Sequence, residues 1–175
     1  MSYSLAHPAR ARFPVKATIG LLAVANILPL LIHLIPSYSG TSVGGVLLPM
    51  FYIPLVALLF LHLRVALVVA VLAPLTNYLI TGLPQGPFAL LLSIELILFT
   101  LLTGRLLRSV VVAWVAAPVA FVLAKVVSAS VLAVIPLLPQ LQPWDYLSGS
   151  IRLALPGVVL LWVVNGAALS YQQHR

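Results

Sequence analysis

Long apolar runs are the feature of this sequence that most restricts its fold. The 175-residue chain is 63% apolar and only 6% charged, and its mean hydropathy is +1.20. A soluble domain normally carries charge on about a quarter of its residues, so this chain lacks the polar surface that a soluble fold needs. An apolar helix crosses a bilayer in about 20 residues. The sequence therefore predicts an all-α, polytopic integral membrane protein with one domain over residues 1–175.

The apolar runs are separated by charged residues and by Gly and Pro, and they predict six transmembrane helices. The boundary between the second and third spans depends on the short polar break at His62–Arg64, and an error there would give five spans. The predicted spans are Lys16–Ile35, Gly45–Leu61, Arg64–Ile80, Phe88–Leu107, Val110–Ile135 and Ile151–Tyr171.

Lys and Arg are distributed unequally between the two sides of this predicted bundle. Seven of the nine basic residues fall on one side, the other side receives only Arg152, and Lys125 lies within a span. Cytoplasmic connections carry the excess of Lys and Arg, so both termini, including a segment at residues 1–15, are predicted to be cytoplasmic. Organelle signals are absent, which favours the plasma (inner) membrane of a bacterium or archaeon. The seven residues are Arg10, Arg12, Lys16, Arg64, Arg105, Arg108 and Arg175.

Several classes of function find no support in the sequence. The basic residues occur one or two at a time between apolar runs, which argues against nucleic-acid binding despite a pI of about 10.4. There is no cysteine, and the isolated His33 and His62 do not form a metal-binding pattern. Catalytic motifs are missing as well, so we expect no enzyme, metal or cofactor, and an intramembrane enzyme is only a remote alternative.

Two charged residues lie inside predicted spans, where an unpartnered charge is costly. Glu95 is about 10 Å below the outer start of the fourth span, and Lys125 is about 15 Å below the outer end of the fifth. Because these depths are similar on neighbouring spans, the two side chains are expected to meet in the outer half of the bundle. They either form a structural ion pair that locks two helices, or line an outward-open cavity and bind polar groups of a ligand.

The outer connections are longer than the cytoplasmic ones and are rich in Gly, Pro, Ser and aromatic residues. Function concentrates on loops of this kind when the scaffold is rigid. We expect Trp144 and Tyr146 to cover a ligand as a lid; alternatively, they belong with Tyr38 to the aromatic belt of the membrane interface. The three connections are Pro36–Gly44, Thr81–Pro87 and Pro136–Ser150.

Small residues recur at four-residue spacing in two predicted spans. The fifth span carries Ala116, Ala120 and Ala124, and the third carries Ala66 and Ala70. Such faces allow two helices to approach closely. They serve either packing inside the bundle or the docking of a partner membrane subunit.

Short motifs follow one another along Leu47–Leu106, which is about a third of the chain. They are Leu48-Pro49-Met50, Ile53-Pro54, Leu72-Ala73-Pro74-Leu75, Thr81-Gly82-x-Pro84, and Glu95-Leu96 with Gly104. In this order, on spans two to four, they resemble the substrate-binding S-components of energy-coupling-factor vitamin importers. Two features depart from that family. The first span lacks a strict Ala-x-x-x-Ala face, and no cysteine is present for cobalt ligation of the kind found in the cobalamin-importing branch.

The resemblance implies six helices around a ligand pocket that the outer loops cap. It also implies capture of a small water-soluble vitamin or cofactor precursor, with release inside driven by a membrane coupling subunit and two cytoplasmic ATPases, or by the chain acting alone. The chain has no Walker motif, which fits that division of labour. The alternative is a non-transporting membrane scaffold that docks a partner through its small-residue faces. The candidate substrate-binding residues are Asn77, Tyr78, Gln85, Glu95, Lys125, Trp144, Asp145 and Arg152.

Overall fold

The computed structural model describes residues 14–34, 43–135 and 138–174, and these ranges contain helices, turns and no β-strand. The all-α prediction is therefore confirmed for the described residues. The predicted charges at Arg10, Arg12 and Arg175, the aromatic Tyr38 and the side chain of His33 lie outside this description. The elements are α1 (Val15–His33), α2 (Val43–Leu47), α3 (Pro49–Phe60), α4 (Leu63–Thr81), α5 (Gly86–Leu106), the short 3₁₀ helix η1 (Ala113–Val115), α6 (Ala116–Val134) and α7 (Pro143–Gln173).

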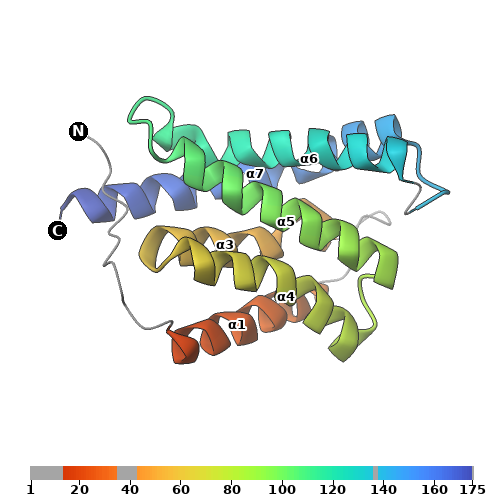
Figure 1. Cartoon of the computed structure of the whole chain (residues 1–175), viewed down its shortest axis with the longest axis horizontal. Coiled ribbons are helices and arrows are strands. Elements are labelled where there is room, and N and C mark those ends of the chain that lie inside the picture. Colours follow the sequence, from red (N-terminus) through yellow and green to blue (C-terminus); the bar gives the residue numbers. More distant parts are fainter. Residues whose placement is uncertain (1–13, 35–42, 136–137, 175) are drawn as a thin grey trace.

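The chain makes six antiparallel passes through an elongated bundle (Figure 1). In the described ranges, five helical segments are long and apolar enough to cross a membrane, and α2 with α3 adds a shorter apolar pass over Gly44–Phe60. The protein is thus a multi-pass membrane protein. We call the end where α4 and α6 finish and α5 and α7 begin the outer end, and the opposite end the inner end.

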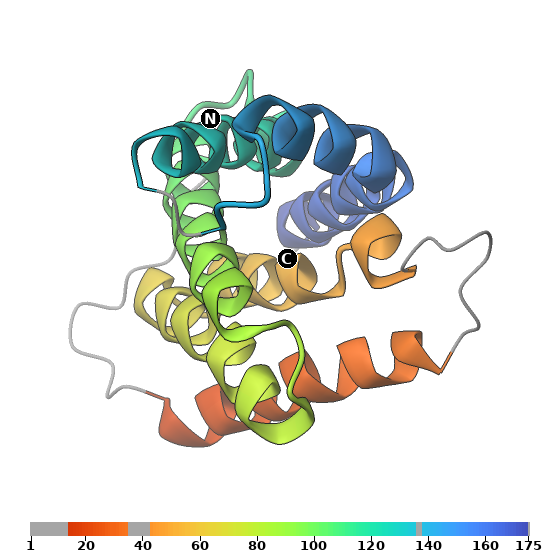
Figure 2. The ribbon, with the colours of Figure 1, turned by 90° about the vertical axis from the view of Figure 1, so that its right-hand side faces the viewer.

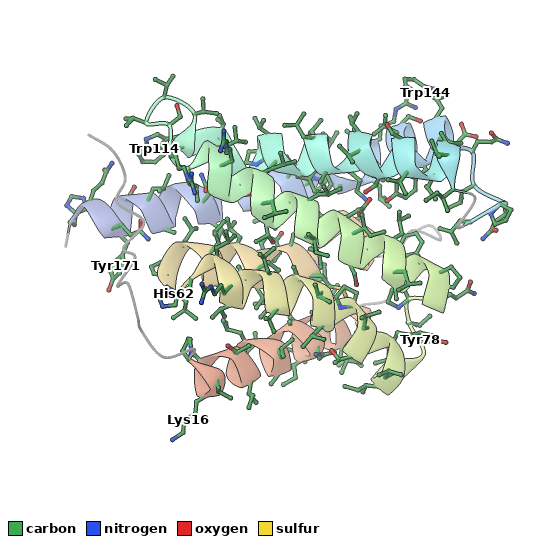
Figure 3. The ribbon with its side chains drawn as sticks, in the orientation of Figure 1. Lys16, His62, Tyr78, Trp114, Trp144 and Tyr171 are labelled. Carbon is green, nitrogen blue, oxygen red and sulfur yellow. The ribbon has the colours of Figure 1, made fainter. Side chains whose placement is uncertain are left out.

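The two ends of the bundle differ in charge as the sequence predicts. Lys16 and His62 lie at the inner end, together with the aromatic Trp114 and Tyr171, whereas Tyr78 and Trp144 lie at the outer end (Figure 3). Arg64 follows the start of α4, and Arg105 belongs to the last turn of α5, so both belong to the inner end as well. The cytoplasmic orientation of the inner end remains a prediction from this charge distribution.

The helices form layers with α3 near the centre. Viewed along the bundle, α6 and α7 lie on one side, α1 lies on the opposite side, and α3, α4 and α5 lie between them (Figure 2). The helix α3 packs against α1, α4, α5 and α7. Its Phe51 makes edge-to-face contacts with Phe99 of α5 and Phe121 of α6, each with 5.2 Å between ring centroids. This aromatic cluster joins three helices in the core.

The second pass is broken into two helices, which the sequence did not predict. Leu48 separates α2 from α3 and adopts a left-handed conformation with φ of 54°. The following Pro49 disfavours an α conformation at the residue before it, and the Tyr52 hydroxyl donates a hydrogen bond of 2.5 Å to the carbonyl of Leu47. The predicted boundary at His62 is correct, because α3 ends at Phe60 and α4 begins at Leu63. The two helices differ in length although the predicted spans do not, since α3 has 12 residues and α4 has 19.

The last helix begins earlier than predicted. The sequence places Pro136–Ser150 in an outer connection and starts the last span at Ile151, but α7 begins at Pro143. A proline at the first helical position and Asp145 in the first turn both favour a helix start here. The Pro, Gly and Ser residues of this stretch therefore led to the prediction of a loop where the structure has two helical turns.

The alanine faces lie inside the bundle. Ala116, Ala120 and Ala124 of α6 and Ala66 and Ala70 of α4 are all buried. They allow neighbouring helices to approach closely, as small residues do in membrane bundles. These faces are therefore used in intramolecular packing and are not available to a partner subunit.

Candidate functional site

Two intramembrane charges meet in the outer half of the bundle. Lys125 of α6 donates a hydrogen bond to Glu95 of α5, with 2.9 Å between Nζ and Oε2, so the predicted contact is confirmed. Tyr146 of α7 completes the group, because its hydroxyl accepts a hydrogen bond of 3.1 Å from Lys125 Nζ and donates one to Glu95 Oε1. Three consecutive helices thus each contribute one member of a closed polar ring.

The ring is almost completely shielded from solvent. The exposed fraction is 1% for Glu95, 7% for Lys125 and 6% for Tyr146. The Lys125 ammonium group also lies 4.9 Å from the Tyr146 ring centroid and 5.8 Å from that of Phe121. Burial of a lone charge would be very costly, and the opposite charge with its hydrogen bonds offsets that cost. The three side chains therefore satisfy one another.

A cavity of about 390 Å³ lies beside this ring. It is bounded by the end of α1, the α2–α3 break, the end of α4 and the starts of α5 and α7, and all of these segments belong to the outer end. Lys125 and Tyr146 form part of its wall, whereas Glu95 lies behind them and does not line it. Most of the remaining wall is apolar. Apolar lining residues include Pro29, Leu48, Met50, Phe51, Phe88, Leu92 and Leu153.

Asn77 is a second polar group in the cavity wall. Its side chain is 3% exposed, and its Oδ1 atom has no hydrogen-bond partner among the described residues. Three other buried side-chain oxygens are also unpartnered there, on Thr103, Ser128 and Asn165, but none of these residues lines the cavity. A buried polar atom without a partner is destabilising. Asn77 lines the cavity, but its unpartnered Oδ1 atom lies below the cavity surface.

The structure brings together only part of the predicted substrate-binding set. Lys125 and Asn77 line the cavity, and Glu95 supports Lys125 from behind. The others are exposed at the outer end and do not line it. These are Tyr78, Gln85, Trp144, Asp145 and Arg152.

The expected aromatic lid is not a loop. Trp144 and Tyr146 both lie in the first turns of α7, where side chains two positions apart point to different faces of the helix. Trp144 is 72% exposed and points away from the bundle (Figure 3), whereas Tyr146 points inward. The sequence singled out Tyr146 by its type and position, but it did not predict the bonds that Tyr146 makes to both charges.

Close packing of α7 against the α2–α3 break shapes one wall of the cavity. A β-carbon at Gly157 would lie 2.6 Å from the carbonyl oxygen of Val46 and 2.8 Å from Leu48 Cγ. One at Gly45 would lie 2.9 Å from Leu153 Cδ2. The contact at Gly157 is with backbone, so glycine is required there for this approach, whereas the end of the Leu153 side chain can shift away from Gly45. The backbone of the break is thereby held against α7.

The opposite rim is a tight turn between α4 and α5. Gly82 ends α4 with a φ of 75°, the left-handed conformation typical of a residue that follows a helix. The Thr81 hydroxyl donates to the carbonyl of Asn77 and accepts a hydrogen bond from the Leu83 amide. The Leu83–Pro84 peptide bond is cis, and both residues line the cavity. The Thr81-Gly82-x-Pro84 motif of the sequence thus forms part of the cavity entrance.

No cluster of three or more His, Cys, Asp or Glu side chains suited to a metal ion occurs in the described ranges. The polar residues that line the cavity are Lys125, Asn77, Tyr146 and Ser150, and the rest of its wall is mainly apolar. This arrangement is suited to binding.

Comparisons with known proteins do not identify a family. No protein-family model, no curated protein sequence and no solved structure matches this chain.

Proposed function

We propose that this protein is the substrate-binding subunit of a membrane importer, of the kind to which its sequence motifs are similar. In this role it captures a small micronutrient, such as a water-soluble vitamin or cofactor precursor, at the outer face and releases it inside. The observation that carries the proposal is the cavity at the outer end, whose mainly apolar wall includes a few polar residues, Asn77, Lys125, Tyr146 and Ser150.

The form of the cavity supports capture of a small molecule. Its volume of about 390 Å³ lies within the range of small-molecule sites, about 300–1,000 Å³. Such sites are mainly apolar with a few polar groups that orient the ligand. Polar side chains inside membrane bundles commonly mark substrate pathways, and here two of them converge on one cavity. The proposed role is binding and release without chemical conversion of the substrate.

The release step requires an energy source outside this chain. A coupling subunit with cytoplasmic ATPases supplies it in the importers that the sequence resembles, and α1 offers a surface to such a partner. Gly20 and Ala23 are exposed on α1, next to the exposed apolar side chains of Ile19, Val24 and Ile27. The excess of basic residues at the inner end favours an orientation with the cavity facing outward in the plasma membrane.

The alternative role as a docking scaffold loses its main support. That hypothesis depended on the alanine faces of α4 and α6, which the bundle buries.

A cavity-filling variant tests the proposal. The protein is purified in mild detergent from cells grown in rich medium, and small molecules released by denaturation are identified by mass spectrometry. Leu92→Trp places a large side chain in the cavity wall and is expected to abolish the copurified compound. Leu90→Trp is the matched control, because Leu90 lies on the same helix but is exposed and does not line the cavity. A compound retained by both variants, or absent from the unaltered protein, would contradict the proposal.

A further inference from the structure

The charge on Lys125 is already neutralised within the protein. Glu95 lies 2.9 Å from the ammonium nitrogen, and Tyr146 bonds to both groups. An ammonium group carries three N–H donors, and these two contacts use two of them. One N–H donor therefore remains for the cavity that Lys125 lines, but the ring as a whole carries no net charge.

A negatively charged guest would disturb this balance. Its charge would join that of Glu95 beside a single ammonium group, and the buried cluster would then carry a net negative charge. Buried uncompensated charge is strongly unfavourable. No other cationic side chain lines the cavity within the described residues, because Arg152 is exposed and outside its wall. The cavity is therefore suited to a neutral molecule.

Asn77 does not add a hydrogen-bond acceptor to this wall. The residue lines the cavity, but its unpartnered Oδ1 atom has almost no accessible surface, so a guest does not reach it. The hydroxyl groups of Tyr146 and Ser150 also belong to the lining residues, and they donate to Glu95 and to the carbonyl of Tyr146. The wall thus offers the remaining N–H donor of Lys125 in mainly apolar surroundings.

Resting on the function proposed above, we propose that the cavity selects electrically neutral, mainly apolar molecules that carry a carbonyl group. That carbonyl accepts a hydrogen bond from Lys125 Nζ. Lys125 acts as a donor in this site rather than as the counter-ion of an acidic substrate.

Matched pairs of small aromatic compounds test this selectivity. Benzamide and benzoate differ in charge but little in shape, as do naphthalenecarboxamide and naphthalenecarboxylate. Binding is measured by calorimetry on the full chain in lipid nanodiscs, with empty nanodiscs as the blank for partition into lipid. We expect the unaltered protein to bind each amide at least about tenfold more tightly than the matching acid.

One variant tests the charge argument directly. Glu95→Gln leaves Lys125 without its counter-ion and should reverse the preference, so that the acids bind more tightly than the amides. Asp145→Asn is the control, because it removes the other acidic residue, which is exposed and outside the cavity.

The outcomes distinguish this inference from the proposed function. Tighter binding of the acids to the unaltered protein, weakened by Lys125→Met, would overturn the neutral-ligand inference and leave the binding role standing. An unchanged preference in Glu95→Gln, or no binding of any probe in the low millimolar range, would also overturn the inference. The binding role itself depends on the separate result for Leu92→Trp and Leu90→Trp.

Discussion

The inner and outer ends of the bundle treat buried polar groups differently. At the inner end, Asn165 of α7 donates hydrogen bonds of 2.8 Å and 3.1 Å to the carbonyls of Ala113 and Trp114, and Gln172 donates to the carbonyl of Leu59. At the outer end, Asn77 is equally buried but makes no hydrogen bond through its side chain to the described residues. One asparagine joins two elements, and the other faces a cavity.

This contrast distinguishes a buried polar side chain that joins two elements from one that lines a cavity. In a membrane bundle no water is available to satisfy a buried amide, so a polar side chain normally finds a partner in the protein. Asn165 follows this rule through its Nδ2 atom, although its Oδ1, like that of Asn77, has no partner among the described residues. Asn77 makes no such bond and lies beside a broken helix and a cavity. Departures from the rule are expected at functional sites.

The largest expected effect comes from splitting the ion pair. Lys125→Met leaves Glu95 as an uncompensated buried carboxylate, and removal of one partner from a buried pair costs about 3–5 kcal/mol. We expect this loss in the free energy of unfolding, measured by reversible SDS titration in mixed micelles. The triple variant Glu95→Leu, Lys125→Met, Tyr146→Phe removes the whole ring and should recover most of the loss. A triple variant as unstable as the single one would show that the ring stabilises the outer end in itself.

A smaller effect is expected where α7 touches the α2–α3 break. Gly157→Ala forces a methyl group against the backbone of Val46, and overpacking of this kind costs about 1–3 kcal/mol. Gly149→Ala is the matched control on the same helix, because nothing lies within 4 Å of its added β-carbon. It should leave stability unchanged or increase it by up to about 1 kcal/mol, since Ala favours helix more than Gly does. Equal melting temperatures for the two variants would show that the backbone of the α2–α3 break shifts easily to accommodate the added methyl group.

The smallest expected effects come from the two asparagines, one at each end of the bundle. Asn165→Ala removes two hydrogen bonds from the inner end and should cost about 1–2 kcal/mol in unfolding free energy. Asn77→Leu should leave stability unchanged or raise it, because an unpartnered amide is replaced by an apolar group of similar size. Thermal unfolding in detergent measures both. A destabilised Asn77→Leu would place that residue among the structural groups and remove the distinction between the ends.

Part of the candidate site followed from the sequence. The meeting of Glu95 and Lys125 could be predicted because helix rise converts sequence position into depth, and only two charges lie so deep. The inclusion of Asn77 and the exclusion of Trp144 could not be derived in this way. Depth is fixed by position along a helix, whereas the direction in which a side chain points depends on how that helix is rotated. Trp144 and Tyr146 have nearly the same depth and opposite surroundings.

The sequence by itself determined that this chain lies in a membrane, that it is helical, and that an acid and a base meet below its outer surface. These are local properties, because hydropathy, charge asymmetry and helix rise act along one segment at a time. Only the tertiary structure decided that Leu48 breaks the second pass, that α7 begins at Pro143, and that a cavity opens beside Lys125 and Asn77. Each of these results depends on contacts between segments far apart in sequence, such as Gly157 against Val46, which no pattern within one segment contains.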